Sequence, residues 1–237
     1  MATESDGRLR ICGQRYRQRQ AAGLAGWADE ASYLQKQHRL DAILAEGRLP
    51  NPCCFLELGC GNGNLTLYMA QKGHRAYGVD VVPEAIAWAR QQAVAQNLRA
   101  EFSIGNVVTL AGFQNAFFDF VFDANCLFMI IGAERQAAIA SLWRVLKPGG
   151  VFYAETHLLN EAITQRLVFS GQDYFDPVGQ YSTVQGQPMY YFSREQEFVT
   201  LIESAGFQIL QREKVPPYPT HPEMTFCAGG MWFVATK

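Results

Sequence analysis

A glycine-rich turn directly after a short apolar segment constrains the fold of this chain more than any other feature. Residues 54–58 read Cys-Phe-Leu-Glu-Leu, and glycines follow at Gly59, Gly61 and Gly63. The apolar segment is typical of a buried strand, and residues 64–72 have the pattern of a helix that Gly73 ends. Glycines between a strand and a helix let the backbone approach a ligand closely, and the free N–H groups of the helix start can bind an anion. The sequence therefore predicts a strand, a ligand-binding turn and a helix.

Strand and helix patterns alternate along the rest of the chain. Further strands are expected at 76–81, 101–104, 118–124 and 151–156, with helices at 83–97 and 134–146. A helix at 193–204, opened by a capping box of Ser193 and Gln196, leads to strands at 207–215 and 226–235. The last two strands should be antiparallel neighbours because their connection is too short for a parallel crossover.

This order predicts an α/β fold. We expect a Rossmann-like, doubly wound sheet of seven strands, mostly parallel with an antiparallel last strand, and with helices on both faces. The length of 237 residues suits a single domain over 1–237.

Two segments lie outside the alternation of strands and helices. Residues 14–48 have a helical pattern, which predicts a helical cap over 1–48, and residues 158–192 show no clear strand but are rich in aromatic residues.

The spacing of the turn distinguishes between two ligand classes. A dinucleotide site has the pattern G-x-G-x-x-G, whereas here the third glycine comes one residue earlier. Glu57 precedes the turn, where a carboxylate would repel a pyrophosphate but would suit an ammonium group. Asp80 ends the second strand about 20 residues after the first glycine, where an acid accepts hydrogen bonds from ribose hydroxyls. A ribose without a pyrophosphate, joined to a cationic amino acid, describes S-adenosylmethionine.

Four segments in order resemble motifs of the class I S-adenosylmethionine-dependent methyltransferases. They are Phe55–Gly63, Tyr77–Pro83, Phe118–Asp123 and Leu146–Gly150. The resemblance is close over about residues 50–157 and looser over 193–237. It implies a Rossmann-like enzyme that transfers a methyl group from S-adenosylmethionine.

The resemblance also implies a role for each matching residue. Glu57 is expected near the amino group of the cofactor and Asp80 at the ribose hydroxyls. Val81 is expected on the adenine face. Asn106, where the family usually has Asp, would bond the adenine amino group, and Val107 would donate its backbone N–H to an adenine nitrogen. The methionine part would lie against the turn and against the residues after the fourth strand: Gly59, Cys60, Gly61, Asn62, Gly63, Ala124 and Asn125.

The substrate side is less defined. Functional groups should follow the parallel strands, as His157 does, and a histidine with a near-neutral pKa could take a proton from a hydroxyl or ammonium acceptor. A packed or solvated histidine is the alternative. The aromatic segment 158–192 is expected to form a substrate lid, and the N-terminal helix with Tyr16 to cover the cofactor. Further substrate-binding candidates are Tyr174, Tyr190, Tyr218 and His221.

Composition limits the other functions. The formal charge of −2 gives no general attraction to nucleic acid, although arginines are dense between Arg8 and Arg19. These arginines indicate either a solvated helix face or a contact with an acidic partner such as RNA. The six cysteines show no metal-binding spacing, and no apolar segment suits a secretion signal or a bilayer span, so a cytoplasmic protein without a metal is expected.

We therefore predict a methyltransferase for a small-molecule O or N acceptor. An RNA-modifying methyltransferase and a non-catalytic S-adenosylmethionine-binding module are the alternatives. The identity of the acceptor and the oligomeric state stay open.

Overall fold

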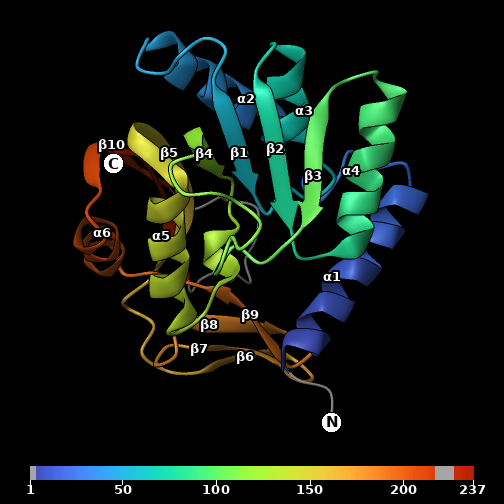
Figure 1. Ribbon diagram of the computed structural model, residues 1–237. Helices are drawn as coiled ribbons and strands as arrows, with labels where there is room; N and C mark the ends of the chain where they lie inside the picture. Colours follow the sequence, from blue (N-terminus) through green and yellow to red (C-terminus); the bar gives the residue numbers. More distant parts are fainter. Residues whose placement is uncertain (1–3, 217–226) are drawn as a thin grey trace.

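A seven-stranded sheet forms the centre of the fold (Figure 1). The computed structural model describes residues 4–216 and 227–237. The strand order is β10-β11-β5-β4-β1-β2-β3, and β11 is antiparallel to both of its neighbours while the remaining pairs are parallel. The predicted α/β sheet with an antiparallel last strand is therefore confirmed. The strands are β1 (Cys54–Leu58), β2 (Arg75–Asp80), β3 (Ala100–Ile104), β4 (Phe118–Asp123), β5 (Leu146–Leu159), β10 (Gln208–Val215) and β11 (Cys227–Thr236).

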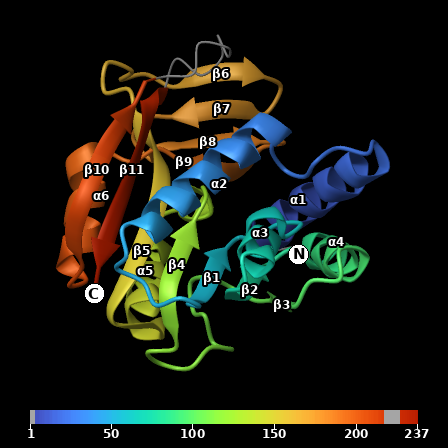
Figure 2. The same ribbon diagram turned by 90° about the horizontal axis from the view of Figure 1, so that it is seen from above.

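Helices cover both faces of this sheet, as Figure 2 shows. One face carries α2 (Glu30–Ala45), α3 (Asn64–Gln71) and α4 (Pro83–Ala95), and the other carries α5 (Glu134–Val145) and α6 (Glu195–Ser204). On the first face Leu40 and Met69 pack with the core phenylalanines Phe55 and Phe122. Because both faces are covered, every residue of β1 is buried.

The N-terminal segment contains two helices rather than the single helix expected over 14–48. These are α1 (Glu4–Ala21) and α2. Gly23 and Gly26 have φ values of 66° and 155° between them, which favours glycine and ends α1. Asp29 then accepts a hydrogen bond of 2.8 Å from the Ser32 N–H and so begins α2 as its N-cap.

Within residues 158–192, four strands form a second, antiparallel sheet, although no clear strand was expected there. Its strands are β6 (Leu167–Ser170), β7 (Asp173–Asp176), β8 (Tyr181–Val184) and β9 (Gln187–Tyr191), in that order. Gln185 and Gly186 join β8 to β9 with φ values of 52° and 74°, the signs of a type I′ turn. The sequence analysis missed this small sheet because its strands are short and Gln is an unusual first residue for such a turn.

The predicted capping box at Ser193 is wrong. The structure has Arg194 at the N-cap of α6, without a side-chain cap. Ser193 is buried instead, and its hydroxyl accepts a hydrogen bond of 2.9 Å from Arg135. The hydroxyl therefore joins α5 to the segment after β9.

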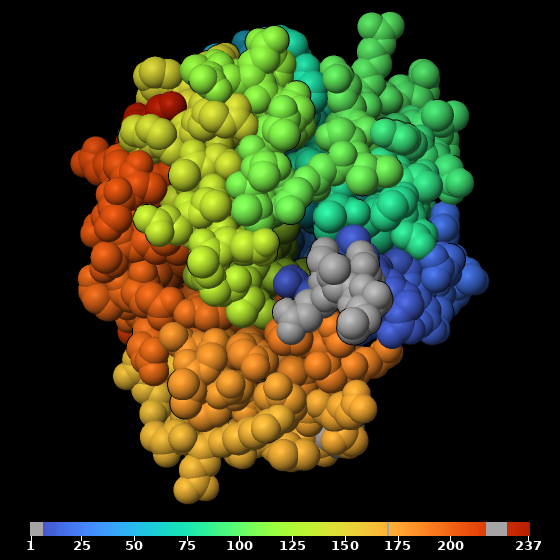
Figure 3. All heavy atoms as spheres, turned by 60° about the horizontal axis from the view of Figure 1, so that its bottom comes forward, coloured from blue at the N-terminus to red at the C-terminus, as the bar shows by residue number. Residues whose placement is uncertain are grey.

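The carboxyl ends of the central strands point toward α1 and the small sheet (Figure 1). N-terminal residues and the small sheet lie side by side on the face shown in Figure 3, and α1 contacts β9. The strand order reverses between β4 and β1, so the switch point where α/β proteins bind ligands lies at this covered edge. Among the helices of the described residues, none is long and apolar enough to cross a membrane.

Candidate cofactor and acceptor site

The glycine turn adopts a backbone conformation that other residues rarely adopt. Gly59, Gly61 and Gly63 have φ values of 57°, 54° and 82°. A Cβ on Gly63 would lie 2.7 Å from the Phe102 ring. Both the dihedral angles and the lack of space therefore require glycine here, and the turn presents its backbone rather than side chains.

Asp80 organises this turn from the end of β2. Its buried carboxylate accepts a hydrogen bond of 2.9 Å from the Gly61 N–H and another of 2.9 Å from the Val82 N–H. Burial raises the pKa of Asp80, while these backbone donors oppose the rise. Each carboxylate oxygen has a second lone pair, so Asp80 can hold the turn and accept from ribose hydroxyls at once.

Glu57 has a structural contact that the sequence did not predict. It is buried in β1 and accepts hydrogen bonds from the backbone N–H and the hydroxyl of Thr66, in the first turn of α3. It therefore serves the free donors of a helix start. Burial raises the pKa of Glu57 to about 8. Its contact with the amino group of the cofactor stays a prediction.

Two aliphatic side chains are exposed near the predicted adenine position. Val81 is 45% exposed directly after β2, and Ile104 is 55% exposed at the end of β3, where it is the neighbour of Asp80. Asn106 is exposed, and its side-chain oxygen accepts a hydrogen bond of 2.8 Å from the Val108 N–H, while Val107 is buried. Ile104 was not among the residues predicted to bind adenine, although an isoleucine that ends the strand beside Asp80 could have suggested it as a candidate.

Asp123 and Asn125 shape the segment after β4. Asp123 is fully buried, and one oxygen accepts from the N–H groups of Cys126 and Leu127, which holds the short helix η1 (Leu127–Met129). Burial raises its pKa to about 7. Ala124 and Asn125 are partly exposed beside it, and Asn125 has a φ of 73°. Both therefore remain candidates for the methionine end.

Glu155 on β5 is a polar residue that the sequence analysis overlooked. It accepts hydrogen bonds from Asn125 at 3.1 Å and from the Tyr153 hydroxyl at 2.6 Å, and pairs with Lys36 of α2 at 3.2 Å. This network joins the cap to the carboxyl ends of β4 and β5. An acid near the end of the fifth strand could have indicated it.

Helix α1 and the segment after it cover the glycine turn. Tyr16 is buried, and its hydroxyl would lie 2.5 Å from a Cβ on Gly61. Asn62 is buried, and its side chain donates a hydrogen bond of 2.9 Å to the Ala25 carbonyl. Cys60 is buried too, its Sγ 2.8 Å from the position of a Cβ on Gly78, which agrees with a spacing role. The proposed methionine-binding surface is therefore enclosed by the N-terminal segment.

His157 lies on β5 among aromatic rings. Its ring centroid is 4.6 Å from that of Phe128, and Nδ1 is 3.7 Å from the sulfur of Cys227. Burial lowers the pKa of His157 to about 4, not to the near-neutral value that a general base would need. His157 is neutral at neutral pH but is a weak base.

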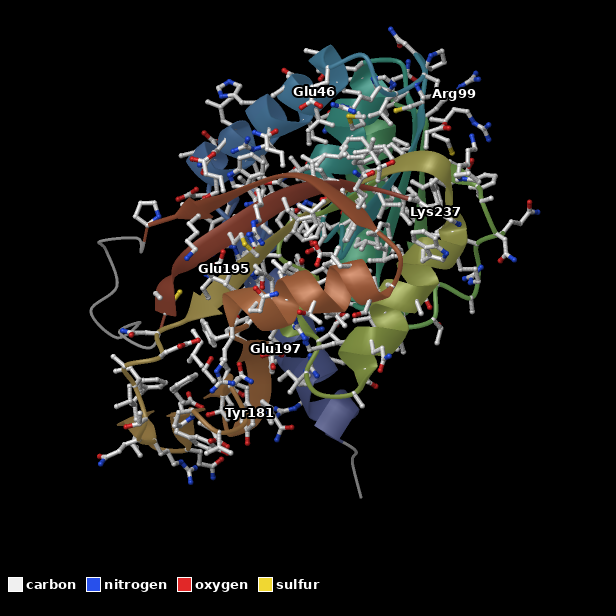
Figure 4. All side chains as sticks on the ribbon, turned by 90° about the vertical axis from the view of Figure 1, so that its left-hand side faces the viewer. Glu46, Arg99, Tyr181, Glu195, Glu197 and Lys237 are labelled. Carbon is white, nitrogen blue, oxygen red and sulfur yellow. The ribbon has the colours of Figure 1, made fainter. Side chains whose placement is uncertain are left out.

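The other candidates for substrate binding lie in different parts of the structure. Tyr190 stacks on Phe128 with centroids 4.9 Å apart and an angle of 5° between the rings. Tyr174 instead packs within the small sheet, where Arg166 lies 3.4 Å over its ring and the Tyr181 hydroxyl is 3.4 Å away. Figure 4 shows Tyr181 well away from the end of α2 marked by Glu46. Tyr218 and His221 lie outside the described residues.

Most of the N-terminal arginines have partners within the chain. Arg8 donates to the Met129 carbonyl, Arg17 pairs with Glu84, and Arg19 donates to the Gly26 carbonyl. Arg15 lies over the Trp27 ring at 4.1 Å. The arginine cluster therefore attaches α1 to the rest of the protein, so neither a purely solvated face nor an acidic partner is needed to explain it.

Metal ligands are not gathered in the part of the chain that the structure describes. Among residues 4–216 and 227–237, no group of three or more His, Cys, Asp or Glu side chains is arranged to hold a metal ion.

Comparisons of sequence identify a domain and its relatives. A family model described as a methyltransferase domain matches residues 56–154. The S-adenosyl-L-methionine-dependent Diels-Alderase iccD of Talaromyces variabilis is 31% identical over 171 residues, which are 67% of this chain and 54% of that protein. A ubiquinone biosynthesis O-methyltransferase of Xanthomonas campestris pv. campestris is 31% identical over 119 residues, or 50% of this chain and 48% of that protein. The chain thus spans about half the length of these curated relatives.

Solved structures share the fold at lower identity. The crystal structure of 1,6-didemethyltoxoflavin-N1-methyltransferase of Burkholderia thailandensis, with bound 1,6-didemethyltoxoflavin and S-adenosylhomocysteine, has a TM-score of 0.68 and 23% identity, and the match covers 100% of this chain and 91% of that chain. The PH0226 protein of Pyrococcus horikoshii OT3 has a TM-score of 0.66 at 20% identity, with 86% of this chain and 90% of that chain covered.

Proposed function

Because the chain belongs to the class I S-adenosylmethionine-dependent methyltransferases, we propose that it transfers the methyl group of S-adenosylmethionine to an oxygen or nitrogen of a small molecule. The single observation that carries the proposal is the contact between the Asp80 carboxylate and the glycine turn. This contact supports the proposal because a buried carboxylate, which could accept from ribose hydroxyls, lies against the backbone of the turn at the switch point of the sheet.

S-adenosylmethionine supplies an activated methyl group on a sulfonium. The protein contributes alignment and exclusion of water, which are large terms for a displacement of this kind. Val81 and Ile104 would flank the adenine, Asp80 would hold the ribose, and the turn would face the methionine part. Tyr16 of α1 would cover the turn and exclude water from it.

The partners of the arginines favour a small molecule over RNA. The formal charge is −2, and Arg8, Arg17 and Arg19 bond to acceptors in the chain itself. An RNA enzyme needs a continuous basic surface that leads to the site.

A second candidate keeps the cofactor bound without consuming it. The Talaromyces variabilis relative is named a Diels-Alderase that depends on S-adenosyl-L-methionine, and it matches a larger share of this chain than the O-methyltransferase does. A cyclisation of this class would need an enclosed apolar site but no base.

Two measurements together test these proposals. Titration calorimetry should show that the protein binds S-adenosylmethionine and S-adenosylhomocysteine, and incubation with metabolite extracts should then release S-adenosylhomocysteine. Absence of binding would overturn both candidates. Binding, with an acceptor consumed but no S-adenosylhomocysteine formed, would favour the cyclisation over methyl transfer.

A further inference from the structure

An aromatic surface lies where η1, β5 and β9 meet. It consists of Phe128, His157 and Tyr190, which we call the aromatic wall. The three rings come from η1, β5 and β9, and each is partly exposed. Phe128 contacts both of the other rings, at centroid distances of 4.6 Å and 4.9 Å. Phe128 and Tyr190 are parallel, with an angle of 5° between their rings, and His157 is tilted by 52° to Phe128, so the three rings offer both faces and edges to a conjugated molecule.

Two cations of α1 lie at the margin of this wall. Arg8 donates to the carbonyl of Met129, the residue after Phe128. Arg15 lies over Trp27 and beside the Tyr190 hydroxyl, where it opposes the rise in the pKa of Tyr190 that burial causes. Neither arginine has a carboxylate within ion-pair distance among the described residues. The margin of the wall therefore favours an anion and disfavours a cation.

Among the described residues, no group that an acceptor at the wall could reach is an effective base at neutral pH. Asp123, whose pKa burial raises to about 7, is fully buried, and one of its oxygens accepts from the N–H groups of Cys126 and Leu127. His157 has a pKa of about 4, and the Glu155 carboxylate is occupied by Asn125, Tyr153 and Lys36. Burial raises the pKa of Cys12 to about 11. Titratable and charged groups surround the wall from α1, α2, the segment after β4, β5, β9 and β11. These groups are Arg8, Cys12, Arg15, Lys36, Asp123, Cys126, Glu155, His157, Tyr190 and Cys227.

We propose that the acceptor is a planar conjugated small molecule with an acidic O–H or ring N–H, bound as its anion between the aromatic wall and the two arginines of α1. This inference rests on the proposed methyl transfer and names its substrate class. The acceptor loses its proton to water before the transfer. A lone pair of the resulting oxygen or nitrogen anion then forms a bond to the methyl carbon, the carbon–sulfur bond breaks, and its electron pair stays on sulfur as neutral S-adenosylhomocysteine.

The first experiment varies the acidity of the acceptor. The intact protein is incubated with S-adenosylmethionine and a series of substituted 2-naphthols of graded pKa, with cyclohexylamine as a non-planar, cationic comparison. Methylation of the naphthols should exceed that of the amine, and the acidic limb of the kcat/KM profile against pH should move with the pKa of each naphthol. An acidic limb that stays at one pH for all naphthols would reveal a base on the enzyme and overturn the proposal.

The second experiment varies the charge of α1. Arg15→Ala should lower kcat/KM for the naphthols about 5-fold, the size expected for a partly solvated charge pair. Arg15→Lys should recover much of this loss because it keeps the charge. Arg10→Ala is the matched control, because Arg10 is exposed on the same helix. Equal effects of the Arg15→Ala and Arg10→Ala variants would contradict a role for the charge of Arg15.

Calorimetry with S-adenosylmethionine distinguishes the possible failures. A protein that does not bind the cofactor refutes the proposed function itself. A protein that binds it and methylates the amine but no naphthol retains the proposed function and refutes the substrate class. A protein that binds it and methylates neither probe also refutes the substrate class.

Discussion

Single buried acids hold the turns of the proposed site. Glu57, Asp80 and Asp123 each accept backbone N–H groups from the segment that follows a strand end. The position of Asp80 could be predicted from its spacing to the glycines. The bonds of Glu57 and Asp123 could not, because they depend on how the next helix folds back over its strand. The contacts made by residues of α1 and α2, such as Lys36, could not be predicted either, because they also depend on how these helices pack on the sheet.

The carboxylate of Asp80 should be essential for the cofactor. Asp80→Asn should weaken the affinity for S-adenosylmethionine by about 10-fold or more, since hydrogen bonds to a charged acceptor are the stronger ones. Asp119→Asn is the matched control, because Asp119 accepts a hydrogen bond of 2.8 Å from the Cys54 N–H at the opposite end of the sheet. Calorimetry on both variants gives the comparison, and equal affinities would argue against the ribose contact.

Glu57 should make the stability depend on pH. Its pKa of about 8 in the folded protein is raised from 4.5, so the protonated form is favoured by folding. Its stabilising contribution is complete below the pKa of the unfolded chain and is lost as the pH rises through about 8. Between about pH 5 and 9, the Tm of the wild type should therefore fall by a few °C relative to Glu57→Gln. Parallel Tm curves for the two proteins would exclude this explanation.

His157 should be replaceable by an aromatic residue. Because its pKa is about 4, it does not act as a base near neutral pH, and Phe keeps a flat ring at that position. His157→Phe should retain kcat at pH 7.5 within about 3-fold, whereas loss of a general base costs about 100-fold or more. A loss of the larger size, measured with an acceptor that the wild type methylates, would restore the catalytic hypothesis.

At the scale of elements, the alternation of strands and helices in the central sheet could be predicted from the sequence. The division of the N-terminal segment into two helices and the small second sheet could not. The strands and helices from β1 to α5 follow strong apolar patterns bounded by glycine or proline, and the structure has them within a few residues of the predicted bounds. Two segments differ. The helices α1 and α2 separate at Gly23 and Gly26, and the small sheet depends on the turn at Gln185 and Gly186. In both cases a few turn residues determine the secondary structure, although the composition of the longer segment around them predicts a different one.

Arg135 is the main polar connection between these elements. Its buried guanidinium donates to the Leu127 and Ile130 carbonyls and to the Ser193 hydroxyl, and it lies 4.1 Å over the Tyr191 ring.

Arg135→Met should reduce the free energy of unfolding by about 2–4 kcal/mol, because three buried acceptors lose their donor. Urea denaturation measures this change, with the exposed Arg99→Ala as the control. Hydrogen exchange should rise in η1 and at the end of β9. A variant as stable as the control would show that the connection contributes nothing.

At the scale of the whole molecule, the charge distribution supports the proposal of a small-molecule acceptor over an RNA acceptor. The net charge is close to zero, and the arginines of α1 are largely used within the chain. These contacts of the arginines within the chain could not be predicted, because the positions of their partners Met129 and Glu84 depend on how α1 packs against the rest of the protein.

The protein should therefore show no appreciable affinity for RNA. Fluorescence anisotropy with a labelled single-stranded RNA at physiological salt should give a Kd weaker than about 100 µM, the weak limit of non-specific binding. A Kd below about 1 µM, with a steep dependence on salt, would favour the RNA-modifying alternative.

The place of β11 in the central sheet has a consequence for synthesis. β11 lies between β5 and β10, and Lys237 donates hydrogen bonds of 2.6 Å to the carbonyl of Trp143 in α5 and of 2.8 Å to that of Leu146 at the start of β5 (Lys237 is labelled in Figure 4). A ribosome makes residues 227–236 after all the strands that they join, so β10 has no partner and one edge of β5 stays open until then. During translation the nascent protein should therefore expose the edge of β5, a largely buried and apolar strand of the kind that chaperones bind, and the sheet can be completed only after residues 227–236 have been made.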